Sequence, residues 1–345
     1  MPVHYIFASL LLFLTTGNAL AAEVDQFSSN RQELNDSREI LNKEVNLLLA
    51  DSIDWANRSR LALGPNKSRR RITPKCDADR LYQALTLSLA RPFLGQLEYF
   101  AQTDPSISRR SVTLEQSIYK NFSWQQSPSL VISKRLAAVI RIGDVELGTD
   151  KLGHFLTEGW SYFEIASQSD SDLNDALLFG EWSEGLYYGA MTTGIFSYSD
   201  LVANFNGYRF WNSILATQPD PLSNKKPEPY VRCNNQKWEL TKDFDWQPYI
   251  DIAWDESHNC SLYRDEMLLN KISQSCQSKE ISPLKQKYSH FAERLINHKG
   301  NQLLPKKLQP ENVLSQRYTS MPQWLKTRLK TYREQLEEWR NNRVH

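Results

Sequence analysis

Apolar residues recur at helical spacing over long parts of this chain. In residues 31–58 they lie seven, four, three and seven positions apart, with charged residues between them, at Leu34, Leu41, Val45, Leu48 and Trp55. This spacing is typical of an amphipathic helix whose apolar face packs against the rest of the protein. Residues 78–102 follow a similar pattern, and Pro92 predicts a kink or break within it.

The densest apolar and aromatic stretch covers residues 131–216. Its pattern predicts three helices: one from Thr149 to about residue 168, one from about residue 172 to residue 193, and one from Ser197 to about residue 216. Thr149 is a good N-cap, and the spacing of Ser197 to Asp200 fits a capping box. We expect the three helices to pack together as a bundle.

The pattern changes after this stretch. Residues 217–262 are rich in Pro, Asn, Lys and Trp without helical periodicity, and residues 280–345 return to helix, with Pro322 at a helix start. The sequence therefore predicts an all-α fold: a helical bundle core, helical N- and C-terminal arms and an irregular disulfide-braced segment. The expected regions are a signal peptide (1–21), an N-terminal helical region (22–130), the central bundle (131–216), the irregular segment (217–279) and a C-terminal helical region (280–345).

Composition excludes two classes of protein. The 345 residues include 41 Lys and Arg against 40 Asp and Glu, so the net charge of +1 supplies no broad positive field for nucleic acid. No stretch reaches the roughly 20 apolar residues that span a bilayer. With 11% aromatic residues and a mean hydropathy of -0.56, the chain is expected to be water-soluble and well packed.

The first residues predict export. The short apolar run Ile6–Leu14 is followed by small residues in which Ala19-Leu20-Ala21 fits an A-x-A cleavage site, and this combination indicates a signal peptide. The segment before the run contains no Lys or Arg. The alternative, an uncleaved anchor, is disfavoured because about ten apolar residues are too few to span a membrane. We expect cleavage after Ala21 and a periplasmic or secreted mature protein.

Export changes how the four cysteines are interpreted. In an oxidising compartment an even number favours two disulfides, and four cysteines allow three connectivities. We prefer Cys76 with Cys233, which ties the two ends of the chain around the middle, and Cys260 with Cys276, which closes a short loop.

The C-terminal residues 301–345 are basic, with nine Lys and Arg residues against four Glu residues. This excess allows peripheral contact between the C-terminal helix and an anionic membrane or polymer. The alternative is a helix whose charged face is only solvated.

Ionisable side chains gather on the three central helices. Asp150, His154 and Glu158 are spaced four residues apart, so they project from one face of the first helix. The second and third helices carry polar residues one turn apart: Glu181 and Glu184, then Asp200 and Asn204. Polar groups in so apolar a segment need partners or water.

This set allows acid–base catalysis. A carboxyl in an apolar wall has a raised pKa and can donate a proton near neutral pH, while a better hydrated carboxylate stays charged. Two such groups flanking a bond are the minimum for glycoside hydrolysis. The candidate roles are general acid for Glu184, base or stabiliser for Asp200 or Asp150, orienter for His154, and substrate binding for Asn204, Glu158 and Glu181.

Two alternatives stay open for the same residues. His154 with Asp150, Glu184 and Asp200 could ligate a divalent metal, the one cofactor that the sequence suggests, although one His among carboxylates is atypical for zinc. In the structural alternative, Asp200 only caps its helix, Asp150 pairs with Lys151 or His154, and Asn204 satisfies a backbone group.

A second polar cluster immediately precedes Cys260 and consists of Asp251, Trp254, Asp255, Glu256, His258 and Asn259. Two of its members, Trp254 and Asp255, are candidate site residues. In a disulfide-pinned loop these two residues would form the rim of a carbohydrate cleft, since Trp faces pack on sugar rings and acids bind hydroxyls. The alternative is a folded loop without a ligand.

The central motifs resemble known families. Asp150-Lys151-Leu152-Gly153-His154-Phe155, then Glu184, then the series from Ser197 through Asp200 and Asn204 to Gly207 are similar to the D-K-x-x-H-F, Glu and S-x-x-D-x-x-x-N-x-x-G series of the VanZ-like and YfiM-like families. The similarity covers about residues 144–211. It implies a helical bundle in the bacterial cell envelope with these polar residues gathered between helices, and it implies no established reaction.

Together these observations predict an exported cell-envelope hydrolase that acts on a cell-wall glycan, peptidoglycan. The aromatic content and the compartment favour a glycan over a peptide or a lipid, and no G-x-S-x-G, H-E-x-x-H or phosphate-loop motif is present. The alternative is a non-catalytic envelope factor whose polar cluster is structural or binds a ligand or metal. The expected partner is the glycan or another envelope polymer, and no nucleic acid.

Overall fold

The computed structural model describes residues 23–28, 33–58, 60–63, 69–72, 75–90, 95–124, 126–185, 189–190, 192–264, 266–272, 281–297 and 300–304. The predicted signal peptide, and the part of the C-terminal helical region that was expected to contact a membrane, lie outside these residues. Within the described ranges, every helix is too short or too polar to cross a bilayer.

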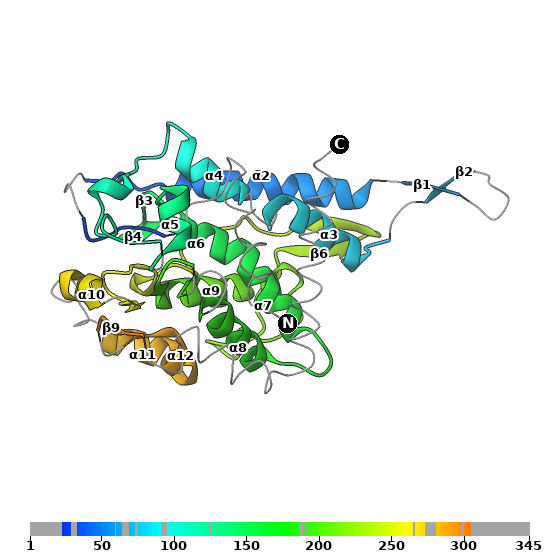
Figure 1. Ribbon diagram of the computed structural model, residues 1–345. Helices are drawn as coiled ribbons and strands as arrows, with labels where there is room; N and C mark the ends of the chain where they lie inside the picture. Colours follow the sequence, from blue (N-terminus) through cyan, green and yellow to red (C-terminus); the bar gives the residue numbers. More distant parts are fainter. Residues whose placement is uncertain are drawn as a thin grey trace, which may run out of the picture.

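Helices form about half of the described structure, and Figure 1 shows how they are arranged. The long α2 lies along one side with α3 and α4, the helices α6 to α9 fill the middle, and α10 to α12 lie on the side away from α2. The bounds are α2 (Arg38–Asn57), α3 (Ala78–Leu89), α4 (Gln96–Thr103), α5 (Pro128–Ser133), α6 (Asp150–Gly153), α7 (Gly159–Ala166), α8 (Leu173–Ser183), α9 (Tyr198–Leu215), α10 (Glu266–Ile272), α11 (Ile281–Tyr288) and α12 (Ala292–Leu295). A π-helical segment, His154–Glu158, joins α6 to α7.

The all-α prediction is wrong, because the described residues also form small β-sheets and the fold is mixed α and β. Three antiparallel hairpins pair β1 with β2, β3 with β4 and β6 with β7, and a three-stranded sheet has the order β5-β8-β9. The strands are β1 (Arg60–Leu63), β2 (Arg69–Ile72), β3 (Val139–Ile142), β4 (Val145–Gly148), β5 (Ile195–Phe196), β6 (Val231–Asn234), β7 (Lys237–Leu240), β8 (Leu262–Tyr263) and β9 (Gln302–Leu303).

In two of these hairpins, the conformation of the loop residues explains why the strands pair. Ile142 pairs with Val145, so the loop between β3 and β4 has only two residues, and the first of them, Gly143, has a φ of +60°. In the β6–β7 loop, Asn235 and Gln236 have φ values of +47° and +67°. Positive φ in a two-residue loop gives the turn whose twist matches paired strands. Such short strands leave too few residues for a clear alternating pattern.

The helical predictions are confirmed in type and corrected in extent. The predicted helix 31–58 is α2, and the predicted break near Pro92 separates α3 from α4. The predicted helix from Thr149 comprises α6, the π-helical segment and α7. The second central helix, α8, ends at Ser183, ten residues before its predicted end. The third matches α9, whose N-cap is the predicted Ser197, which accepts a hydrogen bond from Asp200 N.

A close approach of two backbones places the first central helix against the third. A Cβ atom added to Gly207 of α9 would lie 2.0 Å from the carbonyl oxygen of Phe155, and one added to Gly159 of α7 would lie 2.5 Å from the Cα of Gly207. Only glycine fits at both positions. This contact brings His154 of the π-helical segment within reach of α9.

One of the two disulfides predicted for the irregular segment after the bundle is confirmed. Cys76, just before α3, is bonded to Cys233 of β6, at a sequence separation of 157 residues. Cys260 is also disulfide-bonded. Its predicted partner, Cys276, lies outside the described residues, so that pairing stays a prediction.

Candidate functional site

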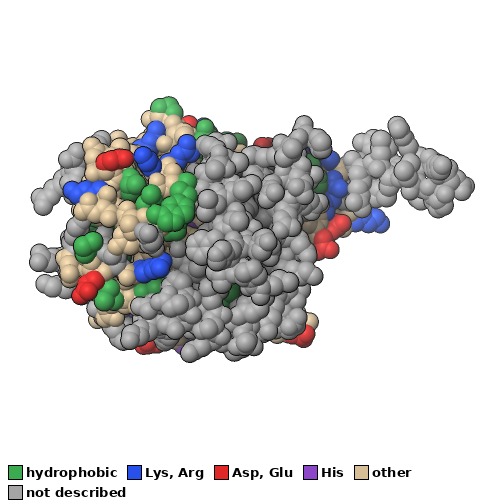
Figure 2. Space-filling view, in the orientation of Figure 1, with side chains coloured by type: hydrophobic (Ala, Val, Ile, Leu, Met, Phe, Trp, Pro, Cys, Tyr) green, Lys and Arg blue, Asp and Glu red, His purple; other side chains and the backbone are tan. Residues whose placement is uncertain are grey.

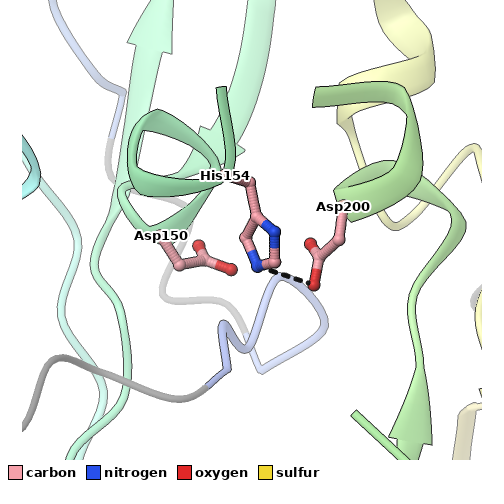
Figure 3. Close-up of side chains that lie close together, drawn as sticks. All are labelled: Asp150, His154 and Asp200. Atoms are coloured by element: carbon pink, nitrogen blue, oxygen red, sulfur yellow. Dashed lines mark ion pairs between the residues drawn. The ribbon is translucent and has the colours of Figure 1, made fainter. Parts of the chain in front are cut away.

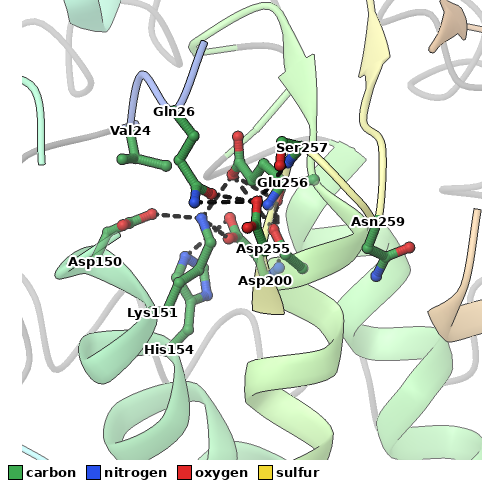
Figure 4. A network of polar contacts seen from close by, with 12 residues as sticks. Val24, Gln26, Asp150, Lys151, His154, Asp200, Asp255, Glu256, Ser257 and Asn259 are labelled. Carbon is green, nitrogen blue, oxygen red and sulfur yellow. Dashed lines mark hydrogen bonds and ion pairs between the residues drawn. The ribbon is translucent and has the colours of Figure 1, made fainter. Parts of the chain in front are cut away.

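Polar side chains from four parts of the chain meet inside the protein. Asp150 and Lys151 come from the start of α6, and His154 begins the π-helical segment. Asp200 comes from the first turn of α9, and Glu256 follows the short 3₁₀ turn Ile252–Trp254. Figure 3 shows Asp150, His154 and Asp200 pointing toward one another, and Figure 4 shows the wider network around Lys151.

Lys151 is the centre of this network. Its side chain is fully buried, and its Nζ lies 2.7 Å from Asp150 Oδ2, 2.6 Å from Asp200 Oδ1 and 2.7 Å from Glu256 Oε1. Burial alone would lower the pKa of Lys151, but the surrounding carboxylates outweigh it and raise that pKa well above its ordinary value. A buried ammonium with three carboxylate partners is a charge that the protein compensates internally.

His154 links Asp200 to Asn204. Its Nε2 lies 3.1 Å from Asp200 Oδ2, and its Nδ1 lies 3.1 Å from the Asn204 side-chain amide. Burial opposes a charge on His154, but Asp200 outweighs burial and raises the pKa of His154 to about 10. In turn, His154 and Lys151 overcome the effect of burial on Asp200 and hold its pKa below its ordinary value.

The amide of Asn204 suits either state of the ring. With its oxygen toward the ring, Asn204 accepts a hydrogen bond from a protonated Nδ1. With its nitrogen there, it donates to an unprotonated Nδ1 and to the backbone oxygens of Asp200 and His154, at 3.1, 3.1 and 3.3 Å. The second orientation makes more hydrogen bonds, whereas the first requires a proton on Nδ1.

Glu184 is a buried carboxyl whose pKa is raised, in contrast to that of Asp200. It directly follows α8, and its Oε1 accepts a hydrogen bond from Ser197 N at 2.9 Å. Burial, followed by repulsion from the Asp200 carboxylate, raises the pKa of Glu184 to about 8. A Cβ atom on Gly189 would lie 2.2 Å from Glu184 Oε1, so the chain folds closely over this carboxyl. Glu184 is therefore protonated at neutral pH while Asp200 is ionised.

The sequence predicted no role in this network for three buried carboxyls: Glu256, which belongs to it, and Glu23 and Glu98, which lie close to it. Glu256 is fully buried, and burial raises its pKa to about 7 even though Lys151 opposes the shift. Burial likewise raises the pKa of Glu23 and of Glu98 well above the ordinary value. The signal for Glu256 was its place in the second polar cluster, but nothing in the sequence related that cluster to Lys151.

The N-terminal residues 23–28 hold Glu256 in place. Gln26 accepts a hydrogen bond from Glu256 N at 2.8 Å and donates to Asp255 Oδ1 at 3.2 Å, as Figure 4 shows. The Glu23 backbone oxygen accepts a hydrogen bond from Ala137 N at 2.7 Å. The cluster is thus closed by the segment that directly follows the predicted cleavage site.

His154 is the most exposed member of the central group. Its side chain is 16% exposed, compared with 7% for Asp150 and for Asp200. Figure 2 shows acidic side chains scattered over the described part of one face, with no acidic patch among them. The close grouping of acids lies inside the protein, and a ligand would reach it beside His154.

Four other predicted site residues lie apart from this group. Glu181 is 24% exposed and pairs with Arg294 at 3.3 Å. Glu158 is buried at the end of the π-helical segment. Trp254 is fully buried against Phe155 in the aromatic core, so its ring face is taken by protein rather than offered to a sugar. Asp255 accepts hydrogen bonds from Ser257 N in its own loop and from Gln26 of the N-terminal segment.

A divalent ion has one suitable group of ligands among the described residues. Single ligand atoms of Asp150, His154 and Asp200 all lie within 4.8 Å of one another. This group contains three of the four metal ligands predicted from sequence, and Glu184 is the one outside it. One imidazole nitrogen with two carboxylate oxygens suits a first-row transition metal better than calcium.

The residues that carry the D-K-x-x-H and S-x-x-D-x-x-x-N motifs are brought together on neighbouring helices. Lys151 and His154 of the first motif contact Asp200 of the second, and His154 also contacts Asn204. Asp150 joins them through Lys151. No family model, curated protein or solved structure matches this chain. The resemblance to the VanZ-like and YfiM-like families stays a prediction carried by the motif residues.

Proposed function

We propose that this protein is an exported hydrolase that cleaves a cell-wall glycan, peptidoglycan, by carboxylate acid–base catalysis. The observation that supports this best is Glu184, a buried carboxyl with a pKa of about 8, in the electrostatic field of Asp200, which two cations hold ionised. Neighbouring carboxyls with such different proton affinities supply an acid and a base at the same pH. Glycoside hydrolysis needs these two groups.

Each residue of the cluster has a role in this mechanism. Glu184 donates its proton to the leaving oxygen of the glycosidic bond. Asp200, which is ionised and held by Lys151 and His154, stabilises positive charge that develops on the sugar ring. Asp150 is the better base for the attacking water, since its Oδ1 has no hydrogen-bond partner among the described residues. Asn204 orients His154 instead of binding substrate.

The pH dependence of turnover tests the role of Glu184. Its carboxyl must be protonated to act as an acid, and it loses its proton as the pH rises through about 8. We therefore expect a plateau near neutral pH and a fall of about tenfold per pH unit on the alkaline side. The measurement is the release of reducing ends from purified peptidoglycan across this range. A rate that still rises above about pH 9 would contradict the assignment.

Binding of a divalent metal is the second candidate function, favoured by the grouping of Asp150, His154 and Asp200. A bound ion would supply an activated water at the same place. The ammonium of Lys151 competes with it, because it already neutralises both carboxylates. These three residues would hold the ion, and Lys151 would keep the two aspartates apart and oriented.

Metal analysis separates the two candidates. If the metal function holds, the purified protein contains about one transition-metal ion per chain, and Asp150→Asn lowers the content at least about tenfold. Glu158→Gln, on the same helical stretch but outside the ligand group, is the matched control and should retain the ion. Protein that folds normally with only trace metal would rule out this second candidate.

A further inference from the structure

A groove between α2 and α3 lies apart from the buried cluster. It encloses about 410 Å³ and is lined by residues that include Asp51, Trp55 and Arg58 of the α2 side and Leu87 and Ser88 of α3. This volume falls within the range of small-ligand pockets, about 300–1,000 Å³. Its lining combines an aromatic ring, an aliphatic side chain, both signs of charge and a hydroxyl.

Trp55 is not buried in the core, although its sequence pattern predicts that it is. The other members of its apolar series, Leu41, Val45 and Leu48, are buried in the core, whereas Trp55 is 38% exposed at the groove. An indole left in water near the end of a helix forgoes a large burial energy. This position is explained if the ring has a ligand to cover it.

Arg80 of α3 holds the Trp55 ring in place. Its guanidinium carbon lies 4.5 Å from the ring centroid. The same guanidinium group donates hydrogen bonds to the backbone oxygens of Trp55, Ala56 and Arg58, at 3.2, 2.9 and 3.0 Å. One face of the ring is therefore fixed against Arg80 by contacts within the protein. A preorganised ring loses little conformational freedom when a ligand packs on its other face.

The polar residues around Trp55 suit hydroxyl groups. Asp51 lies one turn before Trp55 on α2 and offers a carboxylate, and Ser88 offers a hydroxyl. Arg58 also lines the groove, where its exposed guanidinium pairs with Asp54. A pyranose ring has an apolar face of C–H groups and an edge of hydroxyls, so it matches both parts of this lining. An acyl chain would offer no hydrogen-bond partner to the carboxylate of Asp51.

We propose that the Trp55 groove is a binding subsite for a pyranose ring of a glycan, with the ring packed on Trp55 and its hydroxyls bound by Asp51 and Ser88. The choice of a glycan rests on the proposed function, but the subsite lies away from Glu184 and catalyses nothing. Its role is to hold a polymer substrate on the protein.

A titration of the mature chain with a β-1,4-linked tetramer of N-acetylglucosamine tests this subsite. The readout is the indole N–H resonance of Trp55 in the ¹⁵N-labelled protein, assigned through Trp55→Phe. We expect a saturable shift of that resonance, and an affinity at least about tenfold weaker in Trp55→Ala. Trp124→Ala is the matched control, because Trp124 is also 38% exposed but does not line the groove.

Two further variants distinguish failure of the subsite from failure of the catalytic proposal. Asp51→Ala should weaken binding while the protein keeps its melting temperature, since Asp51 is exposed. Glu184→Gln should bind the tetramer as the native chain does even if it has lost turnover, so that failure of the catalytic proposal is separate from failure of this one. An unmoved Trp55 resonance at saturating tetramer, or equal weakening in Trp124→Ala, would overturn the subsite.

Discussion

Lys151→Met lowers the free energy of unfolding by about 3–5 kcal/mol, because it removes one partner of a buried ion cluster. Met is unbranched like lysine and only one heavy atom shorter, so the loss comes mainly from charge and not from a cavity. The ammonium is within 2.7 Å of Asp150, Asp200 and Glu256, and the substitution leaves these carboxylates in a dry environment without their cation. Denaturant unfolding at neutral pH, followed by circular dichroism, measures the effect.

The matched control for this prediction is Lys285→Met. Lys285 is an exposed lysine of α11, so the same change there should alter stability by no more than about 0.5 kcal/mol. A Lys151→Met protein that is as stable as the Lys285→Met protein would mean that the carboxylates do not depend on the ammonium. The description of Lys151 as the centre of the cluster would then be incorrect.

Glu184→Gln lowers the rate of glycan cleavage by about 10²–10⁴-fold, the usual contribution of a general acid. The amide has nearly the shape of the carboxyl, and its oxygen can still accept the hydrogen bond from Ser197 N. It has no proton to donate to a leaving oxygen. Because Glu184 is already neutral at pH 7, the substitution removes no buried charge, and the melting temperature should stay within a few degrees.

Glu181→Gln is the matched control on the same helix. Glu181 lies one turn before Glu184, but it is partly exposed and pairs with Arg294. We expect this variant to keep its rate of turnover. A Glu184→Gln protein that is folded and fully active would exclude Glu184 as the acid, whereas one that unfolds would assign the carboxyl a structural role.

Local patterns were sufficient to predict several parts of this structure. The periodicity of Leu41, Val45 and Leu48 identified α2, and the Ser197 cap identified the start of α9. The four-residue spacing of Asp150 and His154 correctly placed both on one side of a helix, facing Asp200. The Cys76–Cys233 pairing was chosen because it ties the chain ends around the middle, and it is confirmed.

Contacts between distant parts of the chain were not predictable in the same way. Glu256 lies 105 residues after Lys151, and no spacing rule relates the two. The sequence pattern did not predict the strands, because they contain only two to four residues and are too short to display a period of two. Trp55 matched the helical period of its neighbours, yet periodicity alone does not show whether the last turn of a helix still has a core to pack against.

The protein buries several acidic side chains in this site and compensates their charge in two ways. Asp150, Asp200 and Glu256 are neutralised locally by Lys151, with His154 as a second cation for Asp200. The remaining carboxyls, such as Glu184, avoid the cost of burial by keeping their protons. A neutral acid beside compensated carboxylates is the feature on which the catalytic proposal depends.

The most direct test of that proposal is the release of reducing ends from purified peptidoglycan at pH 7 by the native chain without residues 1–21, with Glu184→Gln as its baseline. The account predicts release that is proportional to the amount of native protein and at least about a hundredfold slower with the variant at an unchanged melting temperature. Native protein that is folded and yet releases no reducing ends, or releases them no faster than Glu184→Gln, would contradict the account.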